Sequence, residues 1–246
     1  MSDTAPKKLR RSAEEGAMRA LCIAELRKRY PDARIIQELP LRYSSNRIDL
    51  AAVTPDKIVS LEIKSSRDVA DRLEDQIRAF IPVSHRIIVA LAPCWLPKPE
   101  YRTERRRFGT AYLVNNETPA QAALRRIGAP MMIETWTCCH EAGISGNDRE
   151  WACRDSYPWP VKMLDVLWVS ELKEIATRHR VSVDKRTPHL KLVAACCDVM
   201  TSREIVTAVC RALRGRDAFD KLSDPPVGAE SSKVVPRPAS AQAAFL

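Results

Sequence analysis

The sequence predicts an α/β fold in which one helix precedes three strands, a second helix and a fourth strand. Three observations predict it. Ser12, with Glu15 three residues later, forms a capping-box pattern that typically begins a helix. Three short apolar runs then follow within about thirty residues, as expected for adjacent strands. Finally, a segment with apolar residues at helical spacing is followed by an apolar run between Pro82 and Pro93, which is typical of a buried strand.

Each element has its own signal in the sequence. The first helix is expected over residues 12–29, with Met18, Leu21, Cys22 and Leu26 near one face and Pro31 after its end. Strands are expected at 35–41, 48–54 and 57–65, a helix at 71–83 and a strand at 85–92. Because the second helix separates the third and fourth strands, the last strand can join the sheet through a crossover.

The rest of the chain predicts three further parts. We expect a core domain over residues 12–115, an irregular insert at 116–160 and a helical module at 161–215. Residues 222–246 are rich in Pro, Ser and Ala, which is typical of a disordered tail.

Composition narrows the classes of function. The 246 residues carry a net charge of +9, which favours polyanion partners such as nucleic acid. The polar N-terminus has no secretory signal, and no apolar run is long enough to cross a membrane. We therefore expect a cytoplasmic protein whose eight cysteines are mostly free thiols.

One pair of predicted strands brings charged residues together. If Pro55 and Asp56 form a two-residue turn, Asp49 lies directly opposite Glu62, and the two side chains share a face. Lys64 lies two residues beyond Glu62 and points to the same face. Pro-Asp is not a preferred pair for such a turn, so a bulge could shift this register.

This set of residues suits chemistry on phosphate. Two neighbouring carboxylates repel each other, and Mg²⁺ relieves the repulsion by binding both of them. The Ile63 carbonyl could be a further ligand. Lys64 could position the attacking water or stabilise charge that develops on the phosphate. A simpler alternative is a solvated strand face; the aligned Asp49 and the strand-rich setting favour the site.

These residues resemble the PD-(D/E)XK nuclease superfamily, which has an αβββαβ core, an acidic residue on its second strand and E-x-K on its third. Asp49, Glu62 and Lys64 match that signature. The segment EIKSSRDVADRLEDQ is more closely similar to a small bacterial and phage family of such proteins whose role is poorly defined. The resemblance covers about residues 12–92.

The resemblance implies a restriction-endonuclease-like core and a Mg²⁺-dependent nuclease, with Mn²⁺ as a substitute and DNA as the expected substrate; a homodimer is compatible with it. It implies that Asp49, Glu62 and the Ile63 carbonyl bind the metal and that Lys64 assists catalysis. Glu15 or Glu14 on the first helix and Glu38 on the first strand are further candidate metal ligands. Gln76 matches a helix glutamine behind the site. Glu15 could equally serve only as the capping-box residue, and Glu38 as a surface residue.

Two other segments could bind ligands. Cys138, Cys139, His140 and Cys153 fit no common zinc spacing, so we expect no zinc site. The segment RTERRR at 102–107 is either a phosphate-binding loop or a solvated charge run.

The helices of residues 164–200, with Lys185 and Arg186 between them, resemble SAP-like DNA-binding modules. They lack the usual glycines, with Arg180 near one such position, so a plain helical hairpin is the alternative. For the whole chain, the rival functions are a non-catalytic nucleic-acid or repair-partner binding module on a nuclease fold, and an unrelated basic α/β adaptor.

Overall fold

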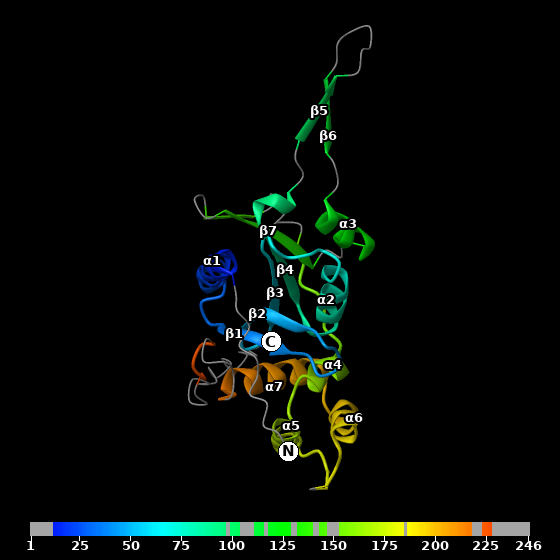
Figure 1. Ribbon diagram of the computed structural model, residues 1–246. Helices are drawn as coiled ribbons and strands as arrows, with labels where there is room; N and C mark the ends of the chain where they lie inside the picture. The colour runs from blue at the N-terminus through cyan, green and yellow to red at the C-terminus, as the bar shows by residue number, and fades with distance from the viewer. Residues whose placement is uncertain are drawn as a thin grey trace, which may run out of the picture.

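The protein is an α/β molecule built on one six-stranded mixed sheet (Figure 1). The computed structural model describes residues 12–96, 99–103, 111–115, 118–128, 132–139, 143–146, 153–184, 186–217 and 223–227. The strands lie in the order β1-β2-β3-β4-β7-β8, and β5 and β6 form a separate hairpin. In Figure 1 this hairpin projects from one end of the molecule, and helices α5, α6 and α7 lie at the other end.

The first half of the chain follows the expected order of elements. It contains α1 (Ala13–Arg29), β1 (Arg34–Pro40), β2 (Arg47–Val53), β3 (Ile58–Lys64), α2 (Leu73–Phe80), η1 (Ile81–Val83) and β4 (Arg86–Leu91). Ser12 caps α1 by accepting a hydrogen bond from the Glu15 N–H at 3.1 Å. The helix predicted at 71–83 ends in a 3-10 turn, because Pro82 has no N–H to continue an α-helix.

The second half contributes two strands of the main sheet, β7 and β8, that the sequence did not predict. It contains η2 (Pro93–Trp95), β5 (Pro99–Thr103), β6 (Ala111–Asn115), α3 (Pro119–Arg126), β7 (Ile133–Cys139), β8 (Gly143–Gly146), α4 (Pro160–Asp165), α5 (Val169–Arg178), α6 (His189–Val199) and α7 (Ser202–Gly215). The interval 116–160 was expected to be an irregular insert, but β7 lies in the main sheet beside β4. Its alternate residues Glu134, Trp136 and Cys138 are buried, and their mixed polarity hid the strand pattern.

Three antiparallel strands and a parallel crossover form the centre of the sheet. β1, β2 and β3 are antiparallel neighbours, and β4 and β7 continue the sheet in parallel to β3. Thr54 N–H donates to the Lys57 carbonyl at 3.0 Å, which closes the predicted two-residue turn. The pairs Val53↔Ile58 and Leu50↔Leu61 then give the register predicted from that turn.

The two faces of the sheet are covered by different helices. On one face, Cys22 and Leu26 of α1 pack against buried residues such as Leu61 and Ile63. On the other face, α2, α3 and the C-terminal helices share a larger core with Val89 and its neighbours. In Figure 1, α1 lies on the opposite side of the strands from α2. Among the described residues, no helix has both the length and the apolar character needed to cross a membrane.

A C-terminal segment covers the outer edge of β1. Ile35 N–H donates to Asp224 Oδ2 at 2.9 Å, and Gln37 N–H donates to Ser223 Oγ at 2.9 Å. Residues 223–227 therefore lie against the sheet, although a disordered tail was expected from residue 222 onward; residues 228–246 are outside the described part of the chain. Covering an edge strand in this way prevents it from pairing with other chains.

Candidate active site

Three strands each place one carboxylate at the same level of the sheet. Gln37 pairs with Leu50 and Leu39 with Ile48, so Glu38 on β1 lies opposite Asp49 on β2. Extending the pair Leu50↔Leu61 by one residue places Asp49 opposite Glu62 on β3. The register therefore aligns Glu38, Asp49 and Glu62 in a row across β1, β2 and β3.

The regular ladder is interrupted along this row. Glu38 has φ 53°, a left-handed conformation that is unusual for a residue other than Gly. On the other side, the Ile63 N–H donates to the Asp49 side chain, with 2.9 Å between N and Oδ2. Because the N–H and C=O of a strand residue point to the same side, the Ile63 carbonyl also points toward β2. At the row of carboxylates, the Asp49 side chain has therefore replaced a backbone carbonyl of β2 as the hydrogen-bond acceptor of the Ile63 N–H.

Lys64 lies on the same face as Glu62, as predicted. Lys64 Nζ is 2.9 Å from Glu62 Oε1 and donates to Gln76 Oε1 at 2.7 Å. Gln76 comes from α2, so the helix behind the sheet fixes the ammonium group. Glu62 is 2 % exposed and Lys64 is 6 % exposed, which excludes the alternative of a solvated strand face.

Burial and like charge shift the pKa of both strand carboxyls. Burial, followed by the nearby Asp49 charge, raises the pKa of Glu62 to about 8, although Lys64 and the Gln76 amide oppose the shift. Burial also raises the pKa of Asp49, while the Ile63 N–H and Arg19 oppose that shift. Glu62 therefore needs an additional positive charge to be fully ionised at neutral pH.

Arg19 of α1 joins the other candidate carboxylates. Its Nη2 lies 3.1 Å from Glu15 Oε1, 3.2 Å from Glu38 Oε1 and 3.5 Å from Asp49 Oδ1, and its Nη1 donates to the Asp49 carbonyl at 2.8 Å. Arg19 is 4 % exposed. Arg19 was not among the residues predicted from the sequence, although its position four residues after Glu15 on a helix was a signal that it contacts that acid.

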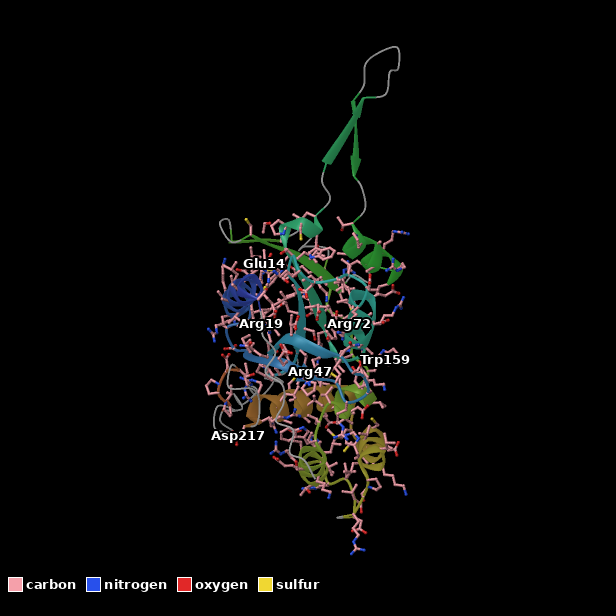
Figure 2. All side chains as sticks on the ribbon, in the orientation of Figure 1. Glu14, Arg19, Arg47, Arg72, Trp159 and Asp217 are labelled. Atoms are coloured by element: carbon pink, nitrogen blue, oxygen red, sulfur yellow. The ribbon has the colours of Figure 1, made fainter. Side chains whose placement is uncertain are left out.

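Glu14, the other candidate carboxylate on α1, has a different partner. Glu14 accepts hydrogen bonds from the backbone and hydroxyl of Ser66, in the connection that follows β3. Figure 2 shows Glu14 and Arg19 on α1. The structure therefore gathers Glu15, Glu38 and Asp49 around Arg19, and places Glu14 at the loop after Lys64.

A divalent cation fits one part of this site. Glu62 Oε2 is buried and has no hydrogen-bond partner within the described residues, so one carboxylate oxygen is left to be satisfied. Asp49, Glu62 and the Ile63 carbonyl offer the oxygen ligands that Mg²⁺ prefers. A group of three or more Asp, Glu, His or Cys side chains able to hold a metal is not found in the described part of the chain. Such an ion would therefore depend on two carboxylates, a backbone oxygen and water.

The N-terminal part of the chain is similar to a family of phage proteins. A family model for bacteriophage P4 protein cII matches residues 9–106, which include α1 through β4 and all the candidate site residues. No curated protein and no solved structure matches the chain.

The structure describes the other candidate segments only in part. Cys138 points into the core, where its Sγ is 3.7 Å from Cys22 Sγ, and all eight cysteines are free thiols. His140 lies outside the described residues. Of the basic segment 102–107, only Arg102 and Thr103 are described, at the end of β5.

Proposed function

We propose that the chain is a Mg²⁺-dependent nuclease of the PD-(D/E)XK type that hydrolyses phosphodiester bonds in DNA on a restriction-endonuclease-like core. The observation that carries the proposal is the buried Glu62, which has one unpartnered oxygen beside Lys64 and the opposite Asp49. A structural ion pair would not need a second carboxylate aligned with the first.

The residues have separate roles in this proposal. Asp49, Glu62 and the Ile63 carbonyl hold the cation, which when bound neutralises the carboxylates and offsets the charge of the phosphate. The Lys64 ammonium stabilises negative charge that develops on the phosphate. Gln76 fixes the direction of Lys64 through their 2.7 Å hydrogen bond. Arg19 fixes Asp49 and keeps Glu15 and Glu38 close to it.

Exposed arginines near the candidate site support a polyanionic substrate. One end of the sheet contains the C-terminal ends of β1 and β3 together with the start of β2. The connections at this end of the sheet carry Arg42, Arg67 and Arg72, and β2 begins with Arg47. All four side chains are exposed. Figure 2 places Arg47 at β2 and Arg72 beside α2. Arginine suits this position because its guanidinium group binds phosphate through two hydrogen bonds.

The alternative is a non-catalytic module that binds nucleic acid or a repair partner. It is favoured by the complete pairing of Lys64, which bonds to both Glu62 and Gln76. In that case the buried charges would serve only to hold β3 against α2.

Incubating the purified chain with linear, circular, single-stranded and branched DNA, in Mg²⁺ or in EDTA, tests the proposal. We expect cleavage in Mg²⁺ alone. Asp49→Asn should abolish cleavage and leave DNA binding equal or tighter, because one negative charge near the phosphate is removed. Asp198→Asn, an exposed acid on α6, is the matched control and should cleave normally.

Each other outcome has a definite meaning. DNA binding without cleavage in either Mg²⁺ or Mn²⁺ would favour the non-catalytic module. Cleavage that survives Asp49→Asn would exclude this site as its source. Loss of binding together with cleavage in Asp49→Asn would make Asp49 a structural residue.

A further inference from the structure

A second basic surface lies between the C-terminal helices α5 and α7. These helices lie at the end of the molecule opposite the β5–β6 hairpin (Figure 1). A groove runs between α5 and α7. One part of it is lined by Arg178, His179, Arg203, Glu204, Thr207, Ala208 and Arg211. A second hollow shares Arg178, Ala208 and Arg211 with the first and continues the groove toward Arg216.

The acids of the groove already have partners. Glu204 completes the cap of α7 by accepting hydrogen bonds from the N–H and hydroxyl of Thr201, both at 2.8 Å. Glu174 pairs with Arg178 at 2.9 Å. In the second hollow, Glu171 pairs with Arg216 at 2.6 Å. These acids therefore leave the other cations of the groove without compensation.

Arg203 and Arg211 are the uncompensated cations. Both are exposed on α7, and neither has an ion pair or hydrogen bond to another described residue. With Thr207 between them they are spaced at i, i+4 and i+8, so they lie on one side of the helix. At 1.5 Å per residue they are separated by about 12 Å along the axis, roughly the rise of three to four nucleotides in one strand of duplex DNA.

The chemistry of the groove favours nucleic acid over a membrane surface. Its cations are arginines, and arginine matches phosphate with two parallel hydrogen bonds. The apolar residues along the groove are Ile175, Ala208, Ala212 and Val227, which lie in a hollow instead of projecting as a bilayer anchor would.

We propose that the groove between α5 and α7 binds the phosphate backbone of nucleic acid, through Arg203 and Arg211, at a site separate from the carboxylates of the sheet. This binding does not require the proposed nuclease activity. It would hold a stretch of the strand away from any bond that is cleaved.

Fluorescence anisotropy with a labelled DNA duplex in EDTA, at several salt concentrations, tests this proposal without scoring cleavage. The double variant Arg203→Gln/Arg211→Gln removes two phosphate contacts. Its slope of log K against log salt should fall by about 1.8, and its affinity near 0.15 M salt should fall roughly 30-fold. The matched control is Lys28→Gln/Lys191→Gln, which changes net charge equally at exposed positions outside the groove. It should keep most of its slope.

Three results would overturn the proposal. An unchanged slope in the arginine variant, with an unaltered melting temperature, would show that the groove does not contact phosphate. An equal loss in the lysine control would assign binding to net charge alone. A variant that loses affinity for phosphatidylserine vesicles but not for the duplex would make the groove a membrane site. Because this assay scores binding in EDTA and not cleavage, failure of the nuclease proposal would remain distinguishable from failure of the groove proposal.

Discussion

Glu62 is a buried acid whose negative charge the surrounding residues offset only in part. Lys64 balances one negative charge, but Asp49 lies opposite and adds a second. In a poorly hydrated site the neutral form of Glu62 is favoured, and this preference makes the stability of the fold depend on pH.

We predict that Glu62 lowers stability as pH rises. Its pKa is raised from 4.5 to about 8, so between these values the folded state keeps a proton that the unfolded state has lost. The free energy of unfolding should therefore fall between about pH 5 and pH 8 and level off above pH 8, by about 2–5 kcal/mol from this group. Urea denaturation in EDTA at a series of pH values measures this free energy of unfolding. Subtracting the profile of Glu62→Gln isolates the effect, and identical profiles would contradict the assigned burial.

Metal binding should show the opposite dependence on pH. A divalent cation binds the ionised carboxylate, so its affinity rises as Glu62 loses its proton. We predict that Mg²⁺ raises the melting temperature more at pH 8.5 than at pH 6. Glu62→Gln and Asp49→Asn should each remove most of this increase, whereas Asp198→Asn should retain it. An equal increase in all four proteins would place the cation elsewhere.

At the scale of elements, α1 is attached to the sheet by a buried charge as well as by apolar packing. Arg19 contacts acids from α1, β1 and β2, which would otherwise repel one another. The left-handed backbone at Glu38 belongs to the same region. The helix therefore fixes the geometry of the candidate site through one guanidinium group.

We predict that Arg19→Met destabilises the fold by about 3–5 kcal/mol, because it removes the buried guanidinium group that offsets the charges of three partly buried carboxylates. Chemical denaturation measures the loss. Adding Glu38→Gln should recover part of it, since one of the stranded charges is then removed. If the double variant is as unstable as Arg19→Met, the loss comes from packing instead of charge.

The end of α5 offers a test of backbone strain. Arg180 has φ 56° at the position just beyond the helix, where Gly is normally preferred. Arg180→Gly should raise the free energy of unfolding by about 0.5–1 kcal/mol, with the gain reduced by the flexibility of Gly in the unfolded chain. Differential scanning calorimetry can detect this change. A decrease instead would mean that contacts of the Arg180 side chain outweigh the strain.

At the scale of the whole molecule, the C-terminal helices and the sheet share one core. Buried residues of α4, α5, α6 and α7 belong to the same apolar cluster as those of β2, β4 and α2. The buried Arg34 of β1 strengthens this connection by donating to the carbonyls of Leu213, Arg214, Arg216 and Asp224.

Truncation after residue 160 should therefore prevent stable folding, because it exposes the face of the sheet that these helices cover and removes four carbonyls to which Arg34 donates. For the full chain we predict one cooperative transition, with the same midpoint by circular dichroism and by tryptophan fluorescence. Two separate midpoints, or a truncated chain with a native-like melt, would show that residues 161–215 are an independent module.

Most of the candidate site could be predicted from the sequence, because it depends on the register between the neighbouring strands β2 and β3. Once Pro55 and Asp56 form the turn, the positions of Asp49, Glu62 and Lys64 follow from the alternation of strand side chains, and the observed pairs agree with this register. Gln76, expected behind the site, accepts a hydrogen bond from Lys64. Arg19 could not be predicted, because a residue of α1 contacts the carboxylates of the strands only after the helix has packed against the sheet.

The sequence by itself determined the order of the first elements, the register of β2 and β3, and the face on which the acidic and basic residues lie. Periodicity and turn chemistry act over a few residues, so the sequence records them directly. Only the tertiary structure decided that β7 completes the sheet, that α7 supports β1, and that Arg203 and Arg211 face a groove beside α5. These features depend on contacts between segments that are far apart in the sequence. The free energy of such contacts cannot be predicted from the pattern of neighbouring residues.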